Sequence, residues 1–69
     1  MNAPIKSKWE CRWNNLVYEV DKIIPDGPDN KFIRFAITEE CKQRAKELGE
    51  RTRKWIREYH IGDGYKSVN

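Results

Sequence analysis

The chain has 69 residues, 38% of them hydrophobic and 36% charged, with a formal net charge of +3. This length fits one domain, and three Trp, three Tyr and two Phe give more aromatic residues than a disordered chain carries. Such mild basicity permits nucleic-acid binding without requiring it.

The N-terminal residues show no targeting segment. Residues 1–8 lack the apolar run of a signal peptide, and no stretch is apolar enough to cross a bilayer. We therefore expect a complete small gene product that is cytoplasmic and has no membrane partner. Two cysteines, Cys11 and Cys41, and the single His60 do not supply the paired ligands of a zinc site. We expect no metal and no other cofactor.

The first elements predicted along the chain are a flexible arm and a β-hairpin. Residues 1–7 have no periodicity and are interpreted as the arm. Strict alternation then predicts strands over residues 8–13 and 16–21, joined by a two-residue turn at Asn14 and Asn15, because Asn tolerates a positive φ. In that register three apolar pairs share one face: Trp13 with Leu16, Cys11 with Tyr18, and Trp9 with Val20.

A third strand is predicted over residues 31–37. Before it, residues 25–30 combine two Pro, one Gly and several Asp and Asn, which break the chain. Alternation along the strand directs Ile33, Phe35 and Ile37 to the core. The same alternation directs Phe32, Arg34 and Ala36 to the outside.

A long helix is predicted to follow, from Thr38 to Gly62. Thr38 suits the N-cap, two glutamates occupy the first turn, and Gly62 suits the stop. At roughly 100° per residue one stripe of this helix is apolar. Its members are Cys41, Ala45, Leu48, Thr52, Trp55, Ile56 and Tyr59. Residues 63–69 are then expected to be a flexible tail.

The predicted fold class is α+β: a three-stranded antiparallel meander packed on one C-terminal helix, in two layers, as a single domain over residues 8–62. The apolar faces of the sheet and the helix cover each other. The expected core is Trp9, Cys11, Trp13, Leu16, Tyr18, Val20, Ile33, Phe35, Ile37, Ala45, Leu48, Trp55, Ile56 and Tyr59. The outer strands would leave unpaired backbone groups, so a homodimer through a sheet edge is one expected assembly.

No set of catalytic residues is recognisable. The chain has no Walker-type loop, HExxH or GxSxG motif, and Gly62-Asp63-Gly64 has no strand before it and no helix after it. His60 alone, near the chain end, is typical of a solvated side chain. We therefore expect a protein that is not an enzyme.

Two features are candidates for binding. One flank of the predicted helix carries a basic row, which could meet phosphates or an acidic protein surface, or simply be solvated. On the outer face of the sheet, an exposed ring lies beside a cation. The candidate residues are Lys42, Lys46, Arg53, Arg57 and His60 on the helix, with Phe32 and Arg34 on the sheet.

Two functional hypotheses follow. The first is a small nucleic-acid-binding accessory or regulatory protein of the phage or plasmid type, which uses the basic helix ridge. The alternative is a protein-binding module that acts as an inhibitor or as a small subunit of a larger complex. Binding to phosphates should weaken steeply with added salt, whereas an apolar protein interface should barely respond.

Overall fold

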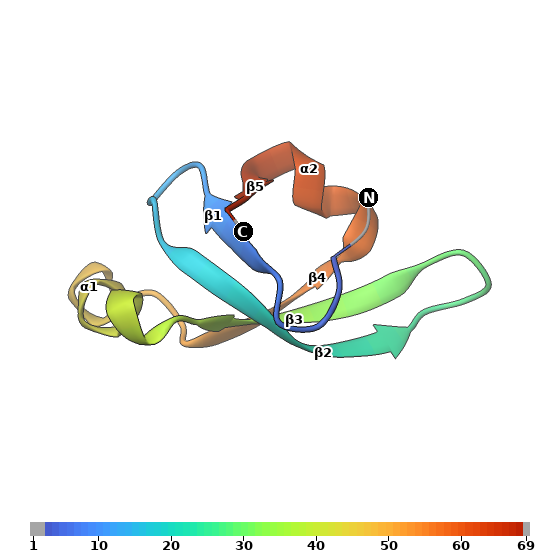
Figure 1. Cartoon of the computed structure of the whole chain (residues 1–69), viewed down its shortest axis with the longest axis horizontal. Helices are drawn as coiled ribbons and strands as arrows, with labels where there is room; N and C mark the ends of the chain where they lie inside the picture. The colour runs from blue at the N-terminus through green and yellow to red at the C-terminus, as the bar shows by residue number, and fades with distance from the viewer. Residues whose placement is uncertain (1–2, 69) are drawn as a thin grey trace.

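The computed structural model describes residues 3–68, which form one five-stranded antiparallel sheet in the order β4-β3-β2-β1-β5. The strands are β1 (Lys8–Cys11), β2 (Val17–Pro25), β3 (Lys31–Ile37), β4 (Arg53–Arg57) and β5 (Tyr65–Ser67). A 3-10 turn, η1 (Glu39–Cys41), and helix α1 (Lys42–Leu48) lie between β3 and β4; η2 (Glu58–His60) and α2 (Ile61–Gly64) lie between β4 and β5. Figure 1 shows the sheet strongly curved, with β1, β5 and α2 above the crossing of β2 and β3, and α1 at one end.

The predicted meander with one C-terminal helix is therefore wrong. The helix ends at Gly49, which has φ 73° and ψ 20° and donates its backbone N–H to the carbonyls of Ala45 and Lys46. Glycine reaches this left-handed conformation at little cost, so it terminates the helix. The chain then returns as β4 along the free side of β3, pairing Trp55 with Arg34. Thr52, Trp55 and Ile56 are residue types that favour strands. The apolar pattern of this segment fits both a helix and a strand, and the hydrogen bonds to β3 favour the strand.

The β1–β2 hairpin was predicted with the right faces and the wrong register. Trp9 pairs with Tyr18 rather than with Val20, a displacement of two residues. Such a displacement keeps every side chain on its own face, because side chains alternate with a period of two. The loop is longer than the predicted turn: Asn15 adopts the positive φ of 61°. The longer loop leaves the Trp13 side chain 76% exposed, outside the core in which we had placed it.

Strand β3 and its inner residues are confirmed, with Ile33, Phe35 and Ile37 all buried. Its pairing with β2 contains an irregularity between Val20 and Lys22. The intervening residue, Asp21, is the extra residue of a β-bulge, a feature that bends a strand and redirects a side chain.

The core fills the concave side of the sheet. The predicted members that are buried are Trp9, Cys11, Leu16, Tyr18, Val20, Ile33, Phe35, Ile37 and Ala45, and the core also contains Ala3, Ile61 and Tyr65. Three of its rings pack together, with centroids 5.8 Å apart for Tyr18–Phe35, 6.2 Å for Tyr18–Tyr65 and 5.0 Å for Phe35–Tyr65. Lys54 on β4 places its Nζ 4.5 Å from the Tyr18 ring and 5.2 Å from the Tyr65 ring, so it joins β4 to β5 across the core. Leu48, Trp55 and Tyr59 were predicted as core members and are exposed.

The two ends of the described chain join the sheet. In the expected arm, Ala3 and Ser7 are buried, and Ser7 Oγ accepts a hydrogen bond of 3.0 Å from the buried Trp9 indole N–H. Residues 63–68, the described part of the expected tail, include β5, which pairs with β1. Strands β1 and β3 are therefore interior, and the sheet edges on which a homodimer could form are β4 and β5.

Candidate functional site

Aromatic and arginine side chains gather on the outer, convex face of β2, β3 and β4, some of them exposed and others half-buried. Inward side chains on β4 are Lys54 and Ile56, so the alternation of the strand directs Arg53, Trp55 and Arg57 outward. Trp55 is 47% exposed and Ile24 is 39% exposed. We call this surface the Trp55 face and define it by six residues: Ile24, Phe32, Arg34, Arg53, Trp55 and Arg57.

The sheet register sets the neighbours on this face. Phe32 on β3 lies between Ile24 on β2 and Arg57 on β4. One row along, Arg34 is paired with Trp55. Neighbouring strands are about 4.8 Å apart, so each aromatic ring lies within reach of a guanidinium. The Arg34 Cζ is 5.7 Å from the Trp55 ring centroid, and the Arg57 Cζ is 5.2 Å from the Phe32 ring centroid.

Two aspartates hold these arginines in place. Arg34 donates its Nε–H to Asp21 Oδ1 over 2.7 Å, and the Arg53 Nε lies 3.7 Å from the other carboxylate oxygen. The hydrogen bond to Asp21 is the main cause that raises the pKa of Arg34, so this group stays charged at any usable pH. Asp21 is the bulged residue of β2, and its carboxylate contacts both guanidinium groups.

Arg57 is positioned by a second carboxylate and by a phenol. Its Nε lies 3.6 Å from Asp26 Oδ2, in the loop between β2 and β3. Its Nη1 donates a hydrogen bond of 3.3 Å to the Tyr59 hydroxyl, the largest cause of its raised pKa. Both ion-pair partners are partly exposed, so the pair orients Arg57 more than it stabilises the fold.

The structure brings together four of the seven residues that the sequence indicated. Phe32 and Arg34 on β3 meet Arg53 and Arg57 on β4, within one face of the sheet. The basic helix ridge does not exist, because its residues are divided between α1, β4 and η2.

The other three predicted residues lie off this face. Lys42 and Lys46 are exposed on α1, and Lys42 Nζ is 2.8 Å from Glu39 Oε1. His60 lies on η2, where its Nδ1 is 3.3 Å from Asp63 Oδ2 and its ring is 4.3 Å from that of Tyr59.

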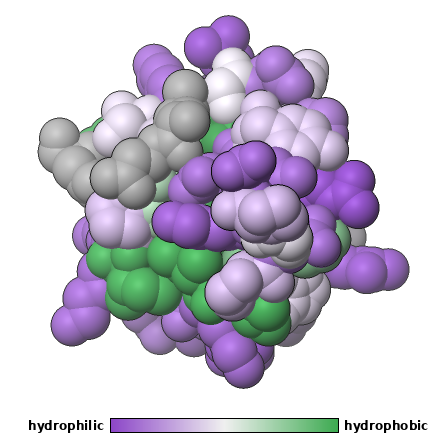
Figure 2. Space-filling model, turned by 90° about the vertical axis from the view of Figure 1, so that its right-hand side faces the viewer, coloured by the Kyte–Doolittle hydropathy of each residue, from purple (hydrophilic) through white to green (hydrophobic). Residues whose placement is uncertain are grey.

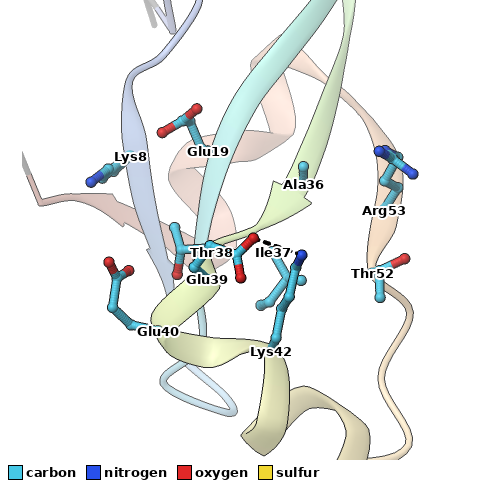
Figure 3. Close-up of a pocket in the computed structure, with 10 residues that line it drawn as sticks. All are labelled: Lys8, Glu19, Ala36, Ile37, Thr38, Glu39, Glu40, Lys42, Thr52 and Arg53. Atoms are coloured by element: carbon cyan, nitrogen blue, oxygen red, sulfur yellow. Dashed lines mark hydrogen bonds and ion pairs between the residues drawn. The ribbon is translucent and has the colours of Figure 1, made fainter.

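A hollow of about 450 Å³ lies where η1 and the start of α1 meet the sheet. Figure 3 shows Lys42 on one side with its contact to Glu39, and Arg53 across from it on β4. The lining carries three cations and three carboxylates: Lys8, Lys42 and Arg53, with Glu19, Glu39 and Glu40. This balance of charge gives an anion no net attraction, so we do not place the binding site here.

The sequence analysis missed Trp55 and Ile24 as surface residues. Trp55 satisfies the helical stripe, which assigned it to the core. The alternative signal was the alternation of Arg53, Trp55 and Arg57 with Lys54 and Ile56, together with Gly49 upstream as a helix stop. Ile24 was unassigned because the bulge in β2 interrupts the alternation just before it.

Comparisons with protein-family models, with curated proteins and with solved structures find no match to this chain. Among residues 3–68, no three His, Cys, Asp or Glu side chains are grouped so that they could hold a metal ion. In the same part of the chain no helix has the length and hydrophobicity needed to span a membrane. The side chains of the Trp55 face offer two kinds of interaction: stacking on rings and charge-assisted hydrogen bonds from guanidinium groups.

Proposed function

We propose that the protein is a small, non-enzymatic nucleic-acid-binding accessory protein, and that the Trp55 face binds the nucleic acid. The observation that supports this most is the alternation of aromatic rings and arginines across β3 and β4. Arginine forms bidentate hydrogen bonds with phosphate, and an aromatic ring offers every base a surface on which to stack.

Asp21 and Asp26 limit the strength of this interaction. They lie beside three arginines, so the local excess of positive charge is small. If the three arginines each contact one phosphate of a single strand, log K should fall against log salt with a slope of about −2. Affinity would then drop roughly 20-fold between about 50 and 200 mM salt.

A matched pair of charge reversals tests where the nucleic acid binds. We expect Arg57→Glu to abolish binding of a labelled oligonucleotide at low salt, measured by fluorescence anisotropy. Lys46→Glu changes the net charge equally but acts on α1, away from the face, so it should leave most of the affinity. Equal losses in the two variants would contradict a site on this face.

The alternative function is protein binding, and one observation favours it. Ile24, Phe32 and Trp55 line a hollow of about 350 Å³ on the same face, and such a hollow can seat an apolar side chain of a partner. Trp and Arg also dominate the energetics of protein interfaces. Failure to bind any oligonucleotide at low salt would favour this alternative. We do not propose self-association through β4, because two antiparallel copies would bring arginines together.

A further inference from the structure

The apolar hollow on the Trp55 face is suited to bind one planar ring. Its lining consists of Ile24, Phe32 and Trp55, and its volume is about 350 Å³. Figure 2 looks onto the end of the molecule that carries the β2–β3 hairpin and shows hydrophobic residues gathered low on this end, among hydrophilic ones. A duplex keeps its bases stacked inside, whereas a single strand can present one base to such a hollow.

The rings of this hollow keep an open surface although arginines lie over them. Trp55 is 47% exposed with Arg34 5.7 Å from its ring centroid. A base stacked on the indole would therefore have a guanidinium nearby, which adds a cation–π contribution. Both arginines that contact rings are also tied to aspartates, so they are held in position before the ligand arrives.

The two outward-facing cations of β4 form a row with the Trp55 indole between them. Arg53 and Arg57 lie on the same face as Trp55, two residues to either side, so the row is about 13 Å long. A base on Trp55 would place the backbone phosphates on its two sides toward Arg53 and Arg57. A single row of arginines can contact the phosphates of one nucleic-acid strand.

A DNA duplex has two phosphate backbones, and the arginines of β4 can contact only one of them. If the sheet entered the major groove, the outer residues of β2 and β1 would have to face the phosphates of the second strand. The outer positions there carry both signs of charge: Glu19 and Asp21 lie with Lys22 on β2, and Glu10 lies with Lys8 on β1 and 3.7 Å from Lys66 Nζ on β5. These opposite charges balance, so this part of the sheet offers a second backbone no net attraction.

The hollow also lacks groups that could identify a base. None of its three lining side chains except the indole has a polar atom, and recognition of a base edge needs directed donors and acceptors. We infer that the ligand is single-stranded nucleic acid, bound by stacking of a base on Trp55 and into this hollow, with little preference among bases. This inference rests on the proposed function and specifies its ligand.

The test measures anisotropy of labelled single-stranded homopolymers and of a mixed-sequence duplex at low salt, with the full chain. We expect the single strands to bind more tightly than the duplex, and the homopolymers to agree within about tenfold. Trp55→Ala should weaken single-strand binding by about 5- to 150-fold, the loss of one stacked base. Trp55→Phe, which keeps a ring, should retain most of the affinity. Trp13→Ala removes an exposed indole in the β1–β2 loop and should leave binding unchanged.

The outcomes separate this inference from the proposed function. A duplex that binds as tightly as the single strand would overturn the inference and leave nucleic-acid binding in place. Single-strand binding that survives Trp55→Ala, or that depends strongly on the base, would also overturn it. No binding of either form at low salt would refute both. Because Trp55 lies outside the core, a urea titration should show that the variants remain folded.

Discussion

Replacement of Gly49 by alanine tests why this chain forms a strand where a helix was predicted. Gly49 has φ 73°, a left-handed conformation that costs a residue with a Cβ about 1–2 kcal/mol. A Cβ built at this position meets no atom within 4 Å, so the cost is that of the backbone alone. Alanine also restricts the unfolded chain, which returns roughly 0.4–1 kcal/mol. We expect Gly49→Ala to lower the free energy of unfolding by about 0.5–1.5 kcal/mol.

The assay is urea unfolding followed by circular dichroism and tryptophan fluorescence. With a slope near 1 kcal/mol per molar urea, the midpoint should fall by roughly 0.5–1.5 M. Gly49→Asn should lose less stability, because asparagine tolerates the left-handed conformation better than alanine does. A Gly49→Ala variant as stable as the parent, or one with increased helix content, would refute the account in which this glycine ends α1.

Three further predictions concern stability and binding. Ser7→Ala removes the acceptor of the buried Trp9 indole N–H and should cost about 1–3 kcal/mol in urea unfolding; an unchanged midpoint would show that this hydrogen bond is dispensable. Burial raises the pKa of Tyr65 from 10.0 to about 12, so the unfolded chain ionises first and stability should fall as pH rises from 10 to 12. Tyr65→Phe should weaken that fall, and an identical alkaline profile for the two proteins would contradict it. Asp21→Asn removes a carboxylate 2.7 Å from Arg34 and should tighten oligonucleotide binding at low salt; weaker binding would show that the positioning of Arg34 by Asp21 outweighs the repulsion between this carboxylate and the phosphates.

The sequence predicted the three central strands of the sheet, β1, β2 and β3, because their local patterns agree with the tertiary structure. Alternation in residues 31–37 placed Ile33 and Phe35 inside and Phe32 and Arg34 outside, as the structure has them. The hairpin faces were also correct, although its register was displaced by two residues. Turn geometry decided that register, and Asn14 and Asn15 fit either a short or a longer loop.

The second half could not be derived from local signals. Residues 50–57 carry an apolar pattern compatible with helix and strand, and the choice depends on the vacant side of β3, which lies far away in sequence. The local signals for a strand were Gly49, through which the predicted helix ran, and the alternation along residues 53–57, which the helical stripe also fitted. Once β4 is a strand, Arg53, Trp55 and Arg57 share a face; on a helix they do not. The Trp55 face therefore depends on the pairing of β4 with β3.

Nuclear magnetic resonance offers the most direct test of a nucleic-acid site on the Trp55 face. The chain has three tryptophans, and each contributes one indole N–H signal. Trp9 is buried, Trp13 lies in the β1–β2 loop and Trp55 lies on the proposed site. On titration with a single-stranded oligonucleotide at low salt, we expect the Trp55 indole signal to shift with the backbone signals of β3 and β4, while the other two indoles stay in place. Shifts confined to α1, or no shifts at all, would contradict the account.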